Sequence, residues 1–123
     1  MVDYFVSPPD FTDLKIESSQ LAQALQQRWP DVQFISRNDD ANTLRWAINI
    51  APGKELWGEL APSGQSVALD GDVYESAEFA RWLRGFVPQQ YPLIFYDEGY
   101  AHDVAITPTT SVDELTRPFV LQP

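Results

Sequence analysis

An uninterrupted series of strand-like segments, joined by very short turns, constrains the fold of this chain most strongly. In TLRWAINIA (43–51) every second residue is large and apolar, which is the period-two pattern of a strand buried on one face. ELWGELA (55–61) and SVALD (66–70) follow it, and VQFISR (32–37) precedes it across the polar loop NDDAN. Links as short as these join neighbouring strands in antiparallel fashion, so the segments predict a four-stranded antiparallel meander.

Both tight turns inside the meander contain a glycine where a left-handed backbone is needed. Pro52-Gly53 fits a type II turn, in which proline takes the first corner and glycine the second. Pro62-Ser63-Gly64 fits a type I turn that is closed by a left-handed glycine. We therefore expect positive φ angles at Gly53 and Gly64.

A segment with helical spacing precedes the meander. We expect it to begin at Ser18 or Ser19, because either hydroxyl can accept a hydrogen bond from the first free N–H groups, and to stop at Pro30. The apolar side chains that recur along one face of this helix are Leu21, Leu25 and Trp29.

Two further helices are predicted after the meander. Asp72, with Glu75 three residues on, is a capping pattern for a helix that ends near Gly85. Ser111 and Glu114 match the S-x-x-E capping box of a short last helix, which we expect Pro118 to end. The apolar face of the longer helix consists of Phe79, Trp82, Leu83 and Phe86.

The remaining strand-like segments complete an α+β pattern. DYFVS (3–7) lies before the first helix, and YPLIFY (91–96) and AHDVAIT (101–107) flank the turn DEGY, where glycine is expected at the position of positive φ. The element order is β-α-β-β-β-β-α-β-β-α. It predicts a single α+β domain over residues 1–123, with an antiparallel meander sheet and two main helices and a short C-terminal helix packed on one face.

Composition limits what such a domain can bind. The chain has 123 residues and no cysteine, and its net charge of −10 comes from 18 acidic and 8 basic residues. Phosphate backbones and anionic membranes would be repelled, so neither a nucleic acid nor a membrane is an expected partner, whereas another protein with a basic surface is permitted. No membrane-length apolar run and no signal-like start is present, so we expect a cytoplasmic protein of bacterial type.

The segment YDEGYAHD (Tyr96–Asp103) concentrates ionisable residues. Asp97, Glu98, His102 and Asp103 have the side-chain types of a divalent-cation site. Neighbouring residues of an extended chain point to opposite faces, however, so at most two of the four would converge without help from another segment. The simpler interpretation is an acidic hairpin tip built from turn-forming residues, and we predict no metal ion or cofactor.

His102 has two possible roles. It shares strand parity with Tyr100, Val104 and Ile106, which predicts a neutral histidine at the edge of the core. The alternative is a general base that is tuned by a neighbouring aspartate. That role needs a nucleophile or a substrate pocket, and the sequence shows neither.

The outer face of the meander is the second candidate site. Trp57 and Glu59 alternate with Leu56 and Leu60, so Trp57 should point away from the core, near Arg45. Tryptophan and arginine dominate binding hot spots, which makes this group a candidate interface anchor. There are two alternatives. Trp57 could face inward with a bulge beside it, or a helix or a second copy of the chain could cover it. A homodimer is therefore a further possibility.

Sequence motifs of catalysis are missing. The chain has no G-x-S-x-G, no H-E-x-x-H and no phosphate-binding glycine loop. We therefore expect a non-catalytic protein-binding domain, in its most specific form an inhibitor-like or immunity-like protein that covers a basic active site. The alternative is a metal-dependent or acid-base enzyme, or an ion-binding protein, centred on Tyr96–Asp103.

Overall fold

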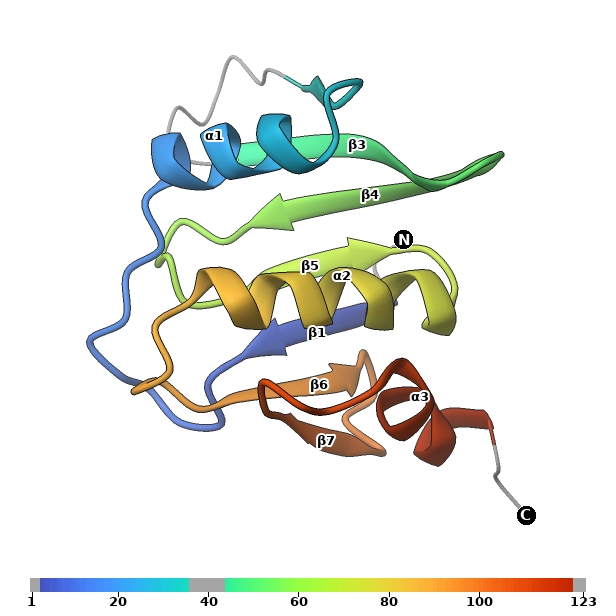
Figure 1. The fold of residues 1–123 in the computed structure, drawn as a ribbon. Helices are drawn as coiled ribbons and strands as arrows, with labels where there is room; N and C mark the ends of the chain where they lie inside the picture. The colour runs from blue at the N-terminus through green and yellow to red at the C-terminus, as the bar shows by residue number, and fades with distance from the viewer. Residues whose placement is uncertain (1–2, 36–43, 121–123) are drawn as a thin grey trace.

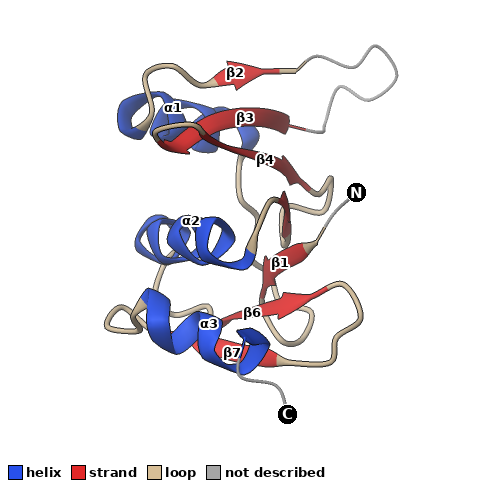
Figure 2. Ribbon diagram, turned by 90° about the vertical axis from the view of Figure 1, so that its right-hand side faces the viewer, coloured by secondary structure: helices blue, strands red, loops and turns tan. Residues whose placement is uncertain are grey.

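The computed structural model describes residues 3–35 and 44–120 and confirms the predicted α+β class and element order. Seven antiparallel strands form one sheet, and three helices lie on one side of it (Figures 1 and 2). In chain order the elements are β1 (Tyr4–Ser7), α1 (Ser18–Arg28), β2 (Gln33–Phe34), β3 (Leu44–Ala51), β4 (Lys54–Leu60), β5 (Val67–Asp70), α2 (Val73–Phe86), β6 (Leu93–Asp97), β7 (Asp103–Ile106) and α3 (Val112–Val120).

The N-terminal strand β1 lies in the interior of the sheet. The strand order is β2-β3-β4-β5-β1-β6-β7, so β1 joins the predicted meander to the C-terminal hairpin. Phe5 of β1 is opposite Ala68 of β5 on one side and Tyr96 of β6 on the other. Segments that are far apart in the sequence therefore share one continuous surface.

The core lies between the sheet and the helices. Trp46, Phe79 and Phe95 are its largest fully buried side chains. The Phe79 ring of α2 stacks on the ring of Trp46 at a centroid distance of 5.7 Å and on the ring of Trp29, also at 5.7 Å. Aromatic pairs of this kind add about 0.5–1.5 kcal/mol to the stability that burial alone provides.

Gly58 makes room for Trp46. The two residues are directly opposite each other on β4 and β3, and a Cβ atom at Gly58 would lie 2.4 Å from two carbon atoms of the indole. The register is regular at this pair, and its only irregularity lies between Asn49 and Ala51. Glycine is therefore required here by a close side-chain approach and not by a bulge.

A buried arginine holds the chain that follows α2. Arg84 is 4% exposed, and its guanidinium donates hydrogen bonds to the carbonyl oxygens of Tyr91 (2.9 Å), Val87 (3.2 Å) and Pro88 (2.9 Å). Burial lowers the pKa of this side chain. The planar fork of donors lets one side chain satisfy three carbonyl groups of the same loop.

Several local predictions are confirmed. Gly53 (φ 71°) and Gly64 (φ 76°) have the left-handed backbone expected in the two meander turns. Asp72 caps α2 by accepting a hydrogen bond from the Glu75 N–H at 2.8 Å. The capping box of α3 is complete, because Ser111 and Glu114 each accept the backbone N–H of the other at 3.0 Å.

Two features of the helix ends differ from the prediction. The helix α1 begins at Ser18 as expected, but its N-cap is Glu17 and makes no side-chain capping bond, so neither Ser18 nor Ser19 has the expected capping role. Pro118 lies inside α3 and does not end it. Proline at this position removes one backbone hydrogen bond close to the C-terminal end of the helix. The loss of helix stability is therefore smaller than for a proline in the centre of a helix.

Within the described residues, the predicted strand VQFISR corresponds to β2 at Gln33–Phe34, and its last two residues lie outside the described part of the chain. The predicted NDDAN loop lies outside the described residues. Within the described part of the chain, no helix is both long enough and apolar enough to cross a membrane.

Candidate functional site

One side of the sheet has no helix packed on it among the described residues (Figures 1 and 2). Alternation along the paired strands decides which side chains point to this side. We call it the open face, and it includes Phe5, Arg45, Ala47, Glu55, Trp57, Glu59, Ala68, Asp70, Tyr96 and Asp103.

Arg45, Trp57 and Glu59 lie together on the open face. Trp57 is 44% exposed, and its indole N–H donates to Glu55 Oε1 at 2.8 Å. Arg45 Nε lies 3.3 Å from Glu59 Oε1. The interpretation in which Trp57 points inward beside a bulge is therefore wrong, because the strand alternation continues regularly through Gly58.

A second aromatic group occupies the other end of the open face. The rings of Phe5 and Tyr96 are stacked at a centroid distance of 5.3 Å, and the rings of Tyr96 and Tyr100 are 4.8 Å apart. The Tyr96 hydroxyl lies 3.1 Å from Ser7 Oγ. Sequence reasoning missed this group, because it depends on the non-local pairing of β1 with β6. The apolar run YPLIFY alone does not show which strand lies beside it.

Tyr100 corrects two expectations about the β6–β7 turn. Its φ angle is 54°, whereas Gly99 has no positive φ, so the expectation that glycine takes the left-handed position is wrong. Tyr100 also does not follow the strand parity of His102, because β7 begins only at Asp103. A left-handed non-glycine residue costs about 1–2 kcal/mol. Tyr100 is 52% exposed, and its ring lies on the open face, against Tyr96.

The acidic cluster of YDEGYAHD is divided in the structure. Asp97 Oδ1 accepts hydrogen bonds from the backbone N–H groups of Ala101 (2.9 Å) and His102 (3.5 Å), and so closes the turn. Glu98 is exposed in that turn. Asp103 is exposed on the open face, opposite Tyr96.

His102 lies at the edge of the core. It is half-buried, and its ring contacts the ring of Phe119 edge-on at a centroid distance of 5.8 Å. Over residues 3–35 and 44–120, no group of three or more histidine, aspartate or glutamate side chains is placed to hold a metal ion.

The open face is strongly acidic around its aromatic side chains. In the described strands it carries the carboxylates of Glu55, Glu59, Asp70 and Asp103, whereas Arg45, which is paired with Glu59, is its one basic residue. Negative charge extends to the end of the face at Tyr100. The pKa of the Tyr100 phenol is raised by desolvation, then by the charges of Asp103, Tyr96 and Asp10.

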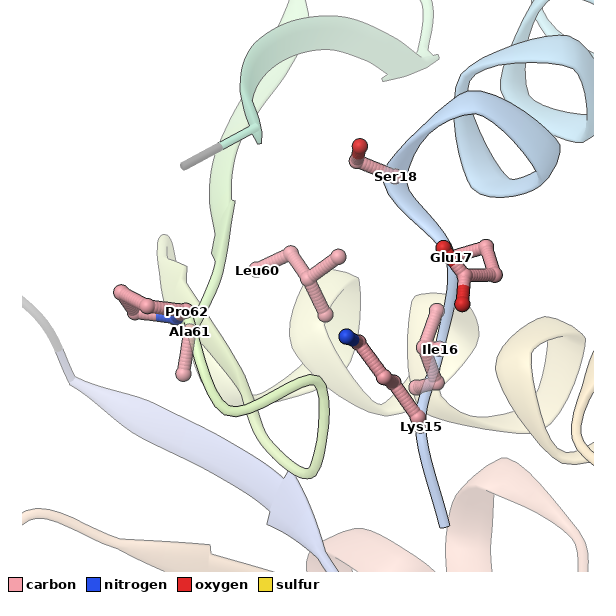
Figure 3. A pocket seen from close by; sticks show the side chains of 7 residues that line it. All are labelled: Lys15, Ile16, Glu17, Ser18, Leu60, Ala61 and Pro62. Carbon is pink, nitrogen blue, oxygen red and sulfur yellow. The ribbon is translucent and has the colours of Figure 1, made fainter. Parts of the chain in front are cut away.

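A pocket lies at the start of α1, beside the end of β4 (Figure 3). Its volume is about 210 Å³. The side chains of Lys15 and Glu17 both line it, so charges of opposite sign share a small space. The other lining residues are Ile16, Ser18, Leu60, Ala61 and Pro62.

Comparison with known proteins finds no match for this chain. No protein-family model, no curated protein and no solved structure is significantly similar to it.

Proposed function

We propose that this protein is a non-catalytic binding domain whose open face docks a protein with a basic surface. The observation that carries the proposal is the combination of exposed aromatic side chains and an excess of carboxylates over basic groups on the face of the sheet that no described helix covers. Trp57 and Tyr100 are 44% and 52% exposed there. Exposed aromatic residues on a flat surface provide a large area for burial, and in interfaces they are the commonest energetic anchors.

Charge selects the kind of partner. The whole chain carries a net charge of −10, and in the described strands the open face has the carboxylates of Glu55, Glu59, Asp70 and Asp103 and the guanidinium of Arg45. A nucleic acid would be repelled by this field, and two copies of the open face would repel each other. A basic protein surface would be attracted, and the same charges would speed its association at low salt. In its most specific form, the partner is an enzyme whose basic active site this domain covers.

Nuclear magnetic resonance tests the proposal on the isolated protein. We expect a hexa-arginine peptide to shift amide resonances of the open-face strands and to leave α1 and α2 unchanged, whereas hexa-glutamate shifts neither. Because the attraction is electrostatic, the shifts should be largely lost when the salt concentration is raised from about 0.02 M to about 0.5 M.

Two matched variants locate the binding surface. Trp57→Ala removes an exposed aromatic ring from the open face, and Tyr74→Ala removes one from α2, where Tyr74 is 53% exposed. We expect Trp57→Ala to weaken peptide binding about threefold or more, since contacts between a cation and an exposed ring contribute on the order of 1 kcal/mol. Tyr74→Ala should leave the affinity for the peptide unchanged. Equal losses in both variants, or peptide shifts confined to the helices, would contradict the proposal.

A further inference from the structure

The end of the open face formed by Tyr96, Tyr100 and Asp103 has the features of a subsite for one side chain. We infer that it binds an arginine side chain of the basic partner, by stacking of the guanidinium on Tyr100 and ion pairing with Asp103. This inference rests on the proposed function and names the chemical group that one part of the open face recognises.

Three rings in series build the floor of the subsite. Phe5 supports Tyr96 with nearly parallel planes, 15° apart, and Tyr96 supports Tyr100 at 4.8 Å. Tyr100 ends the series and is 52% exposed, so ring surface remains for a ligand. Planar guanidinium groups stack on tyrosine within about 6 Å of the ring centre, and they lose less hydration there than an ammonium group does.

Carboxylates lie beside this floor. Asp103 is opposite Tyr96 in the register of β6 and β7, and its charge and that of Asp10 both act on the Tyr100 phenol. Both aspartates are exposed. No ion pair within the described part of the chain involves either of them. A guanidinium on Tyr100 would therefore find anionic acceptors that are not already paired inside the protein.

The backbone at Tyr100 adds an independent argument. Residue 100 has a φ of 54°, a conformation that suits glycine, and the neighbouring glycine at position 99 does not have a positive φ. The β6–β7 turn alone does not need a tyrosine at this position. The left-handed backbone places the ring against Tyr96 on the open face, and unfavourable conformations of this kind are concentrated at binding sites.

Peptide titration of four proteins tests the inference. The variant Tyr100→Gly removes the ring but suits the left-handed backbone, so it should fold at least as well as the wild type. Tyr100→Phe retains the aromatic ring, and Asp103→Asn removes one negative charge without changing the shape of the side chain. We expect hexa-arginine to bind the wild type more tightly than hexa-lysine does, by roughly threefold, because only guanidinium stacks and pairs in two places.

The variants should change this preference in a defined way. Tyr100→Gly should weaken hexa-arginine binding about fivefold and remove the preference over hexa-lysine, and Tyr100→Phe should retain both. Asp103→Asn should weaken both peptides, by about two- to threefold. An unchanged preference for arginine in Tyr100→Gly would overturn the inference, and so would the absence of a preference in the wild type.

Amide shifts separate this inference from the wider proposal. If hexa-arginine shifts the strands around Trp57 and leaves residues 96–103 unchanged, the arginine subsite is wrong and the docking of a basic protein on the open face stands. If residues 96–103 shift and the region of Trp57 does not, the subsite stands and the extended docking face is wrong. If neither region shifts, both proposals fail.

Discussion

Gly58 shows how a single residue controls the packing of the helix layer. The indole of Trp46 lies where a side chain at position 58 would be, and Trp46 in turn supports Phe79 of α2. A tryptophan beside a strand glycine covers backbone that would otherwise be exposed, which compensates for the weak strand propensity of glycine.

We predict that Gly58→Ala lowers the free energy of unfolding by about 1–3 kcal/mol, because the new methyl group would overlap the Trp46 ring in a closely packed core. Urea unfolding followed by tryptophan fluorescence measures the change. Gly85→Ala is the matched control. Gly85 is a helical residue, and apart from its chain neighbours and the backbone of its own helix no atom lies within 4 Å of the position of its Cβ. Alanine there should therefore raise the free energy of unfolding by about 0.5–1 kcal/mol. If Gly58→Ala left the free energy of unfolding unchanged, the indole of Trp46 would not lie against position 58.

At the scale of elements, local chemistry accounts for the ends of two helices. Asp72 and the pair Ser111–Glu114 are recognisable as caps in the sequence, and both make the expected hydrogen bonds. α1 lacks such a cap, because Glu17 holds the capping position without a side-chain bond. The burial of Leu21 and Leu25 supports α1 instead, which is a tertiary contribution that cap rules do not include.

The cap of α2 predicts a pH dependence of stability. Burial raises the pKa of Asp72, but hydrogen bonds from the Glu75 N–H, the Glu75 side chain and the Tyr74 N–H, together with the charge of Lys54, outweigh it, so the pKa lies below its usual value. A lowered pKa in the folded state means that the stabilisation is present above the unfolded pKa, near 3.9, and is lost as the pH falls through the folded pKa.

The test of this cap uses the Glu75→Gln background, since the hydrogen bond and charge of Asp72 raise the pKa of Glu75 and couple the two groups. In that background, Asp72→Ala should lower the free energy of unfolding by about 1 kcal/mol at pH 7. The difference should narrow over the range of pH below about 3.9, the pKa of an aspartate in the unfolded chain, because the pKa of Asp72 is lowered in the folded state. Unfolding curves at several pH values measure it, and a difference that stays constant over this range would contradict the role of the carboxylate.

At the scale of the whole molecule, the net charge of −10 is a source of self-repulsion. Part of it is gathered on the open face, where Glu55 and Asp103 are exposed. Repulsion of this kind favours solubility and destabilises the compact state, and salt screens it over a Debye length of roughly 10 Å at 0.1 M.

We therefore predict that sodium chloride stabilises the fold. The urea midpoint should rise when the salt concentration is raised from about 0.02 M to about 0.3 M, whereas binding of a basic peptide to the open face should weaken over the same range. The double variant Glu55→Gln, Asp103→Asn should show a smaller rise in the midpoint. A midpoint that falls with salt would mean that attractive ion pairs outweigh the repulsion.

The sequence by itself determined the properties that depend on near neighbours along the chain. Strand alternation and the turns at Gly53 and Gly64 identified the meander and placed Trp57 with Glu59 on its outer face, because strand period and turn geometry are local. Tertiary structure alone decided that β1 enters between β5 and β6, that Phe5 meets Tyr96, and that Tyr100 takes the left-handed backbone. Those outcomes depend on contacts between distant segments, and local preferences do not encode which distant segment will be the partner.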